Sequence, residues 1–235
     1  MSASAVVAET LHRVYPGGTT AVRAVSLRVA PGEVLGVCGR SGSGKSTLLR
    51  LLAGLERPDS GRLLLGGAPV WPESGRSAGP RLPRPGWVMP VFQNARASLD
   101  PRWPLWRIIT EPLTVGPPGR AVPERARLRE LATAELERVG LGQLDPLARP
   151  GSLSTGQCQR VAIVRALVAG PGLVVADEPT ASLDLTTAAG VTRLLRQAAD
   201  AGSALVVVGH DVDRLAVLAD RVVRMVDGAL TEQGG

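Results

Sequence analysis

Several kinds of residue are scarce in this sequence. Two cysteines, Cys38 and Cys158, are too few for a disulfide framework or a zinc site, which favours a reducing compartment. No apolar run approaches the roughly 18–20 residues that a membrane-spanning helix needs. The first residues also lack the charged start and apolar segment of a signal peptide. We therefore expect a cytoplasmic protein.

Aromatic residues and lysine are also rare. Aromatics are 3% of the 235 residues, and lysine occurs once, at Lys45, although lysine and arginine together number 27. A net charge of +6 could attract nucleic acid or an anionic membrane. Because the arginines are spread along the chain and aromatics are few, a solvated arginine surface is the favoured interpretation, and no nucleic acid partner is expected. The single lysine is a candidate functional residue.

The apolar fraction of 44% suffices for the core of one large domain, or of one domain with an inserted subdomain. Apolar periodicity predicts strands at residues 5–11, 25–29, 34–38, 87–92, 173–177, 204–209 and 221–226. It predicts helices at residues 46–53, 105–111, 124–139, 185–199 and 214–219. Residues 66–86 hold five prolines and five glycines, which predicts an exposed loop. The strand–helix alternation predicts an α/β fold with a mostly parallel sheet.

One segment fits the phosphate-binding loop G-x-x-x-x-G-K-[ST], and it lies between a predicted strand and a predicted helix, as the motif requires. Small residues let backbone N–H groups surround phosphates, and the helix directs its positive end at them. Lys45 would supply charge to the β- and γ-phosphates, and the Ser46 hydroxyl could ligate Mg²⁺. The candidate nucleotide-binding residues are Gly39, Arg40, Ser41, Gly42, Ser43, Gly44, Lys45, Ser46 and Thr47.

A second apolar strand ends in two carboxylates, Asp177 and Glu178. A strand end beside a phosphate loop is where an aspartate that holds Mg²⁺ belongs. Glu178 would then polarise a water molecule for attack on the γ-phosphate. ATP and Mg²⁺ are the expected cofactors.

The string Leu153-Ser154-Thr155-Gly156-Gln157 resembles the signature motif of ATP-binding-cassette (ABC) ATPases, usually LSGGQ, and the motifs follow the family's order over nearly the whole chain. The resemblance implies that Tyr15 stacks on adenine and that Gln93 contacts Mg²⁺ and the membrane partner. It also implies that residues 181–184 form the D-loop, with Asp184 near nucleotide, and that His210 is the switch histidine. The signature residues Ser154, Thr155, Gly156 and Gln157 would contact the nucleotide of a partner ATPase.

This resemblance implies a P-loop NTPase core with a mostly parallel sheet, an N-terminal antiparallel β-subdomain and an inserted α-helical subdomain. We expect one ABC ATPase domain over residues 1–235, in which residues 1–99 and 171–235 form the nucleotide-binding core. Residues 100–170 would form the helical subdomain that carries the signature.

The segment from Phe92 to Arg102, followed by Glu111-Pro112-Leu113, resembles the dipeptide, oligopeptide and nickel importer ATPases. The implied partners are transmembrane permease subunits, a second ATPase subunit and, indirectly, a solute-binding protein, with the chain peripheral at the inner face of the plasma membrane. The alternative is a soluble ABC ATPase of the DNA repair or translation type, which would carry a long coiled-coil insertion or two cassettes.

Thr155 departs from the usual glycine of the signature. A β-branched residue adds bulk and restricts the backbone where the loop must approach a phosphate. This departure favours a heterodimer over a homodimer, because a heterodimer would confine the altered signature to one ATP site. The alternative is that threonine is simply tolerated there.

Overall fold

Two β-sheets form the framework of the fold in a computed structural model that describes residues 4–72, 79–116, 121–181 and 183–232. The antiparallel sheet has the order β2-β1-β4-β5, and the second sheet has the order β10-β9-β3-β8-β7-β6. The first contains β1 (Val6–Val14), β2 (Thr20–Val29), β4 (Ser60–Leu65) and β5 (Ala68–Pro69). The second contains β3 (Val34–Cys38), β6 (Val88–Val91), β7 (Leu173–Asp177), β8 (Ala204–Gly209), β9 (Arg221–Val226) and β10 (Ala229–Glu232). Its pairings are parallel except that between β9 and β10.

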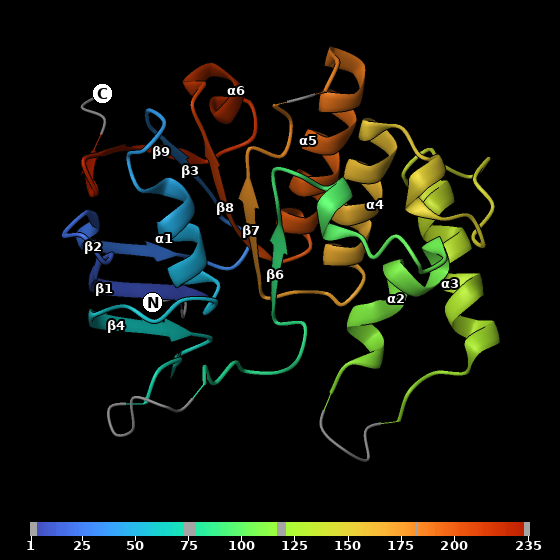
Figure 1. The fold of residues 1–235 in the computed structure, drawn as a ribbon, viewed down its shortest axis with the longest axis horizontal. Helices are drawn as coiled ribbons and strands as arrows, with labels where there is room; N and C mark the ends of the chain where they lie inside the picture. Colours follow the sequence, from blue (N-terminus) through green and yellow to red (C-terminus); the bar gives the residue numbers. More distant parts are fainter. Residues whose placement is uncertain (1–3, 73–78, 117–120, 182, 233–235) are drawn as a thin grey trace.

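The six-stranded sheet is covered on both faces, which explains why its central strands are continuous apolar runs. Helix α1 (Lys45–Leu52) and the antiparallel sheet pack against one face. The other face carries α4 (Thr155–Leu167) and α5 (Leu185–Asp200). Figure 1 shows these groups on opposite sides of strands β6, β7 and β8. Residues alternate between the two cores along β3: Val34 and Cys38 join one, and Leu35 and Val37 join the other.

The segment predicted as a helical subdomain, residues 100–170, contains α2 (Leu105–Thr114), α3 (Arg125–Arg138) and α4. On α3 the predicted apolar face is buried at Leu128, Ala132 and Leu136. These residues belong to the same hydrophobic core as strand residues such as Val174. The helical segment is therefore continuous with the sheet in its packing.

The structure confirms the predicted fold class and corrects several details. Residues 66–86 are not all exposed loop, because β5 pairs with β4 and the Val70 side chain is fully buried. Residues 73–78 of that segment lie outside the described residues. The last predicted helix begins earlier and is shorter, since α6 spans Val212–Ala216, where the Asp211 carboxylate accepts backbone N–H bonds at the N-terminus. The sequence pattern missed β4 and β10, both of which lie in antiparallel pairings.

Candidate functional site

The phosphate loop joins the carboxyl end of β3 to the first turn of α1, where free backbone N–H groups and the helix dipole favour an anion. Gly44 precedes the helix with φ of 104°, and a Cβ atom there would lie 2.0 Å from the Ala21 carbonyl oxygen. Only glycine fits this close approach. The Lys45 ammonium donates to the carbonyl oxygens of Gly39 at 2.8 Å and Arg40 at 2.9 Å. The lysine is 7% exposed, so its charge is held at the inner side of the loop.

Two predicted magnesium ligands meet although they are far apart in the sequence. The Ser46 hydroxyl donates to Asp177 Oδ2 at 2.9 Å, which joins the first turn of α1 to the end of β7. A hydroxyl and a carboxylate oxygen are hard donors of the kind that Mg²⁺ prefers. In the described part of the chain, no cluster of three or more His, Cys, Asp or Glu side chains is placed to hold a metal ion. This pair fits an ion whose remaining ligands are phosphate oxygens and water.

Glu178 is held between two polar side chains. His210 Nδ1 lies 3.0 Å from Glu178 Oε1, and Gln93 Nε2 donates to Glu178 Oε2 at 3.3 Å. The Glu178 backbone has φ of 44°, a left-handed conformation that is uncommon for a residue with a side chain. Its N–H donates to the Val208 carbonyl at 3.0 Å, which ties this conformation to the neighbouring strand. The three residues come from the ends of β6, β7 and β8, so the sheet brings them together.

One cavity of about 570 Å³ collects most of the predicted site. The predicted residues that line it are Tyr15, Ser41, Gly42, Gly44, Lys45, Ser46, Thr47, Gln93, Asp177, Glu178 and His210. Gly39, Arg40 and Ser43 line an adjoining cavity of about 670 Å³ that shares Ser41, Gly42 and His210. Sequence reasoning missed Thr19, Thr20 and Ala21, which also line the first cavity. No motif marks them, because they reach the loop through the hairpin between β1 and β2.

Tyr15 lies at the edge of the first cavity in a polar network. Its hydroxyl donates to Glu56 Oε2 at 3.0 Å and accepts from Arg50 at 2.8 Å, and it lies 3.3 Å from the Thr47 hydroxyl. The Arg13 guanidinium lies 5.3 Å from the ring centroid. Hydrogen bonds from the two arginines and from Tyr15 outweigh the opposing effect of burial and lower the pKa of Glu56. The network fixes the tyrosine ring beside the phosphate loop.

The signature residues lie outside both of these cavities. Ser154 caps α4, where its hydroxyl accepts from Gln157 N–H at 3.3 Å and its own N–H donates to Gln157 Oε1 at 2.8 Å. Thr155 is exposed in the first turn of this helix and has no left-handed backbone. The backbone at Thr155 is therefore one that threonine adopts readily. Gly156 packs near Thr187, whose methyl would lie 3.1 Å from an added Cβ.

Asp184 also lies outside these cavities, at the N-terminus of α5. Its carboxylate accepts from the Thr187 N–H at 3.0 Å, and this hydrogen bond holds the pKa of Asp184 below its usual value. Ser182, from the same predicted D-loop, lies outside the described residues. The phosphate-loop residues therefore line the two cavities, whereas the signature residues and Asp184 lie outside them.

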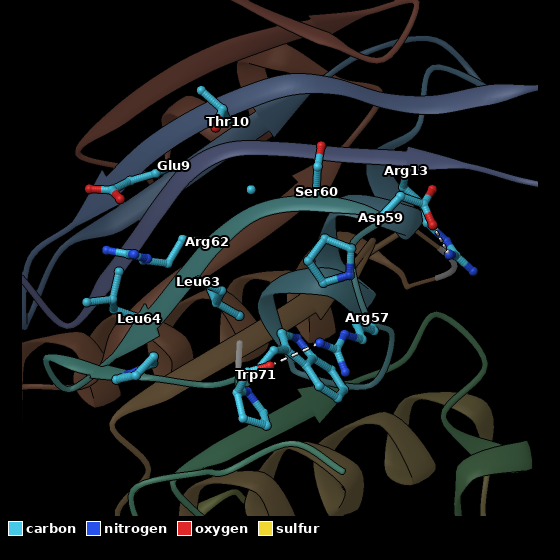
Figure 2. Close-up of a pocket in the computed structure, with 14 residues that line it drawn as sticks. Glu9, Thr10, Arg13, Arg57, Asp59, Ser60, Arg62, Leu63, Leu64 and Trp71 are labelled. Atoms are coloured by element: carbon cyan, nitrogen blue, oxygen red, sulfur yellow. Dashed lines mark hydrogen bonds and ion pairs between the residues drawn. The ribbon is translucent and has the colours of Figure 1, made fainter. Parts of the chain in front are cut away.

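A further cavity, of about 910 Å³, lies on the antiparallel sheet and shares no lining residue with the phosphate loop. Figure 2 shows its lining residues along β1 and β4, with Arg57 beside Trp71. The Arg57 guanidinium lies 5.7 Å from the Trp71 ring centroid and donates to the Pro72 carbonyl at 3.0 Å. None of the predicted site residues lines this cavity.

A phosphate loop after β3, an acidic pair after β7 and a mostly parallel sheet define a P-loop nucleoside triphosphatase. The family model described as "ABC transporter" matches residues 22–181. The chain belongs to this family.

Several known proteins are similar in sequence to this chain. The chain is 40% identical to the lipoprotein-releasing system ATP-binding protein LolD of Pseudomonas syringae pv. tomato, over 99% of this chain and 100% of LolD. It is 37% identical to the probable D,D-dipeptide transport ATP-binding protein DdpF of Escherichia coli, over 91% of this chain. The chain spans only 63% of DdpF and 57% of a similar methionine import protein, MetN of Mesorhizobium japonicum.

Solved structures agree with the family. The dimeric ATP-binding cassette MJ0796, in a post-hydrolysis state with ADP and Pi, superposes with a TM-score of 0.82 at 27% identity, covering 98% of this chain and 100% of that one. The protein cbiO1 from Clostridium perfringens, part of the complex cbiONQ, superposes with a TM-score of 0.78 at 26% identity, covering 98% of this chain and 88% of that one.

None of the helices within the described ranges has the length and apolar character needed to cross a bilayer.

Proposed function

We propose that this chain binds ATP with Mg²⁺ in the 570 Å³ cavity and that hydrolysis there energises a membrane transporter. The observation that carries the proposal is the convergence of Lys45, the Ser46–Asp177 pair and Glu178 on one cavity. Lys45 would exchange its bonds to the loop carbonyls for bonds to phosphate oxygens. Ser46 and Asp177 would hold Mg²⁺, which neutralises phosphate charge when it is bound. Tyr15 would stack on adenine, with its hydroxyl anchored away from the base.

Glu178 would orient and deprotonate the attacking water. Its carboxylate has one oxygen next to His210 and the other next to Gln93, so both neighbours fix the direction in which it accepts a proton. His210 is 66% exposed at the cavity mouth, where it could also reach the γ-phosphate. Gln93 would contact the metal ion as well as Glu178. The residues that would position the attacking water and accept its proton thus all follow strands of one sheet.

A second ATPase subunit would complete the site. The capped N-terminus of α4 carries Ser154 and free N–H groups, a surface suited to a phosphate. Because these residues lie outside this chain's own cavity, they would serve the partner's ATP. Asp184 would lie near the same junction. We propose a heterodimer over a homodimer, because Thr155 adds side-chain bulk at an exposed position of the signature and the importer resemblance implies paired, non-identical ATPases.

For the transported solute, we propose a peptide, nickel or a related small solute, taken up through permease subunits and a solute-binding protein. The support is the segment from Phe92 to Arg102 and the similarity to DdpF, whose name states D,D-dipeptide transport. We propose that the chain is peripheral at the inner face of the plasma membrane. The competing candidate is a lipoprotein-releasing ATPase, favoured by the match to LolD over that protein's full length.

The test is to reconstitute this chain with the permease proteins that the genes adjacent to its own gene encode. In proteoliposomes, ATP hydrolysis should rise when the neighbouring solute-binding protein is added with a dipeptide or Ni²⁺, and the Lys45→Ala complex should show no rise. Stimulation by an acylated lipoprotein, with none by the small solutes, would support the releasing ATPase instead. Hydrolysis that no membrane partner changes would contradict the transport role.

A further inference from the structure

A short helical turn lies in the chain between Gln93, which is predicted to contact this chain's own ATP site, and the signature, which would contact the partner's ATP. This turn, η1 (Arg96–Ser98), begins three residues after Gln93. Its flanking residues Ala95 and Leu99 are 4% and 2% exposed, so the core holds both ends of the turn. The turn therefore keeps its place whatever side chain occupies position 96.

Arg96 reaches from this turn to the loop that precedes the signature. Its guanidinium donates to the Pro150 carbonyl at 3.2 Å and also to the Leu153 carbonyl. Leu153 is 3% exposed and directly precedes Ser154, the cap of α4. The same Pro150 carbonyl lies 3.9 Å from the Cys158 sulfur. Burial of this cysteine raises its thiol pKa, so it stays a neutral packing group beside the arginine.

A second arginine connects the other end of the turn to the same helix. Arg165, on α4, donates to the Ser98 carbonyl at 2.6 Å. It holds the turn against the body of the helix but does not contact the signature loop. Of these two arginines, Arg96 alone contacts backbone atoms of that loop in the described structure.

We infer that Arg96 is a positioning residue that fixes the signature loop relative to the Gln93 segment and so sets the position of the signature that serves the partner's ATP. The inference rests on the proposed function for its two-site arrangement. Arginine suits the role because its planar fork donates to two carbonyls at once, and its charge strengthens both bonds. A lysine can donate to the same carbonyls from a single nitrogen, with poorer geometry.

The first experiment uses the full chain without nucleotide. Hydrogen exchange is measured by mass spectrometry for wild type, Arg96→Met, Arg96→Lys and the control Arg102→Met. Arg102 is an 83% exposed arginine that, among the residues the structure describes, bonds only to Asp100 in its own turn. Arg96→Met should speed exchange in residues 150–158 by about tenfold, with Arg96→Lys intermediate and the control unchanged. The phosphate loop, residues 39–47, should exchange equally in all four. Unchanged exchange at residues 150–158 would overturn the inference.

The second experiment uses dimers in which one ATP site is silenced, with the ATPase subunit that the wild-type chain pairs with, whether a second copy or another protein. In the first arrangement, this chain carries Arg96→Met and Glu178→Gln, and the partner hydrolyses ATP beneath the altered signature. In the second arrangement, this chain carries Arg96→Met with Glu178 intact, and the partner's site is silenced.

The turnover number in the first arrangement should fall about tenfold with KM within about twofold, because a displaced signature acts on the transition state. The second arrangement should keep its rate within about twofold, since the buried residues beside Gln93 hold the turn. Arg96→Lys should recover part of the loss. Equal losses in both arrangements would show general damage and overturn the inference. Absence of ATP binding by the wild-type chain would instead refute the proposed function, and the exchange experiment would still decide the position of the loop.

Discussion

Replacing Glu178 with glutamine should separate the chemistry of the site from its stability. The side chain is 18% exposed and keeps its size in this variant. The amide oxygen can still accept from Gln93, and the amide group can still meet His210 in one tautomer of the imidazole. The substitution leaves the left-handed backbone conformation at position 178 unchanged. The free energy of unfolding should therefore stay within about 0.5–1 kcal/mol of wild type.

Hydrolysis should respond much more strongly. The amide has no basic lone pair, so the attacking water loses the group that accepts its proton. Loss of a general base costs about 10²–10⁴ in rate, which corresponds to about 2.7–5.4 kcal/mol of barrier. This exceeds the expected stability change several-fold, so the two quantities can be distinguished. ATP binding should persist, because Lys45 and the Ser46–Asp177 pair are untouched, and the ATP-bound dimer should accumulate.

The assay combines steady-state phosphate release, equilibrium ATP binding, thermal unfolding and size-exclusion chromatography in ATP. Glu135→Gln serves as the charge-matched control, since Glu135 is 19% exposed, pairs with Arg138 on α3 and lines neither cavity of the site. The control should hydrolyse ATP at the wild-type rate. A Glu178→Gln enzyme with turnover within about threefold of the control would refute the assignment of the base. A large fall in unfolding temperature would show that the loss of rate has a structural cause.

Four further outcomes are expected. Lys45→Ala should abolish tight ATP binding in an equilibrium titration, because no other lysine exists and arginine is too planar to replace it. Tyr15→Ala should weaken ATP binding by about 1–3 kcal/mol with little change in maximal rate, whereas Tyr15→Phe should bind normally if the ring stacks on adenine. Thr155→Gly should raise hydrolysis in the partner's site only, measured with either site silenced, and no change in either background would show that threonine is tolerated. Asp220 accepts from the Val34 N–H, which lowers its folded pKa, so its stabilisation is complete above the unfolded pKa and is lost as pH falls through the folded value. The stability difference between wild type and Asp220→Asn should shrink over that acid range in denaturant titrations.

The sequence predicts the parallel core well because burial on both faces leaves a continuous apolar run. Strands at residues 34–38, 173–177, 204–209 and 221–226 have the predicted bounds. Strand β4 escapes prediction because it begins with Ser60-Gly61-Arg62 and Gly61 has φ of 95°. Its pairings with β1 and β5 make it a strand. Tertiary pairing therefore decides the edges of the fold, where local composition says little.

For the site, too, local motifs predict some features and only the tertiary structure shows the others. The phosphate-loop motif and the acidic strand end placed Lys45, Asp177 and Glu178 together on chemical grounds, and the family resemblance added His210. The structure brings all four to one cavity. Spacing could not show the contacts of the Tyr15 hydroxyl, because its partners Thr47, Arg50 and Glu56 lie 32 to 41 residues further along the chain. It could not show the role we infer for Arg96 either, since that side chain contacts backbone carbonyls, which carry no residue identity.

The two cores on opposite faces of the six-stranded sheet have an evolutionary consequence. Helix α1 and the phosphate loop are supported by one core, and α4 with its neighbours is supported by the other. Substitutions that share no packing partners act almost independently on stability. A lineage can therefore remodel the exposed surfaces of α2 and α3 to suit a new partner while the packing beneath the nucleotide stays intact. The sheet acts as a partition between the part of the chain that is free to diversify and the part that chemistry constrains.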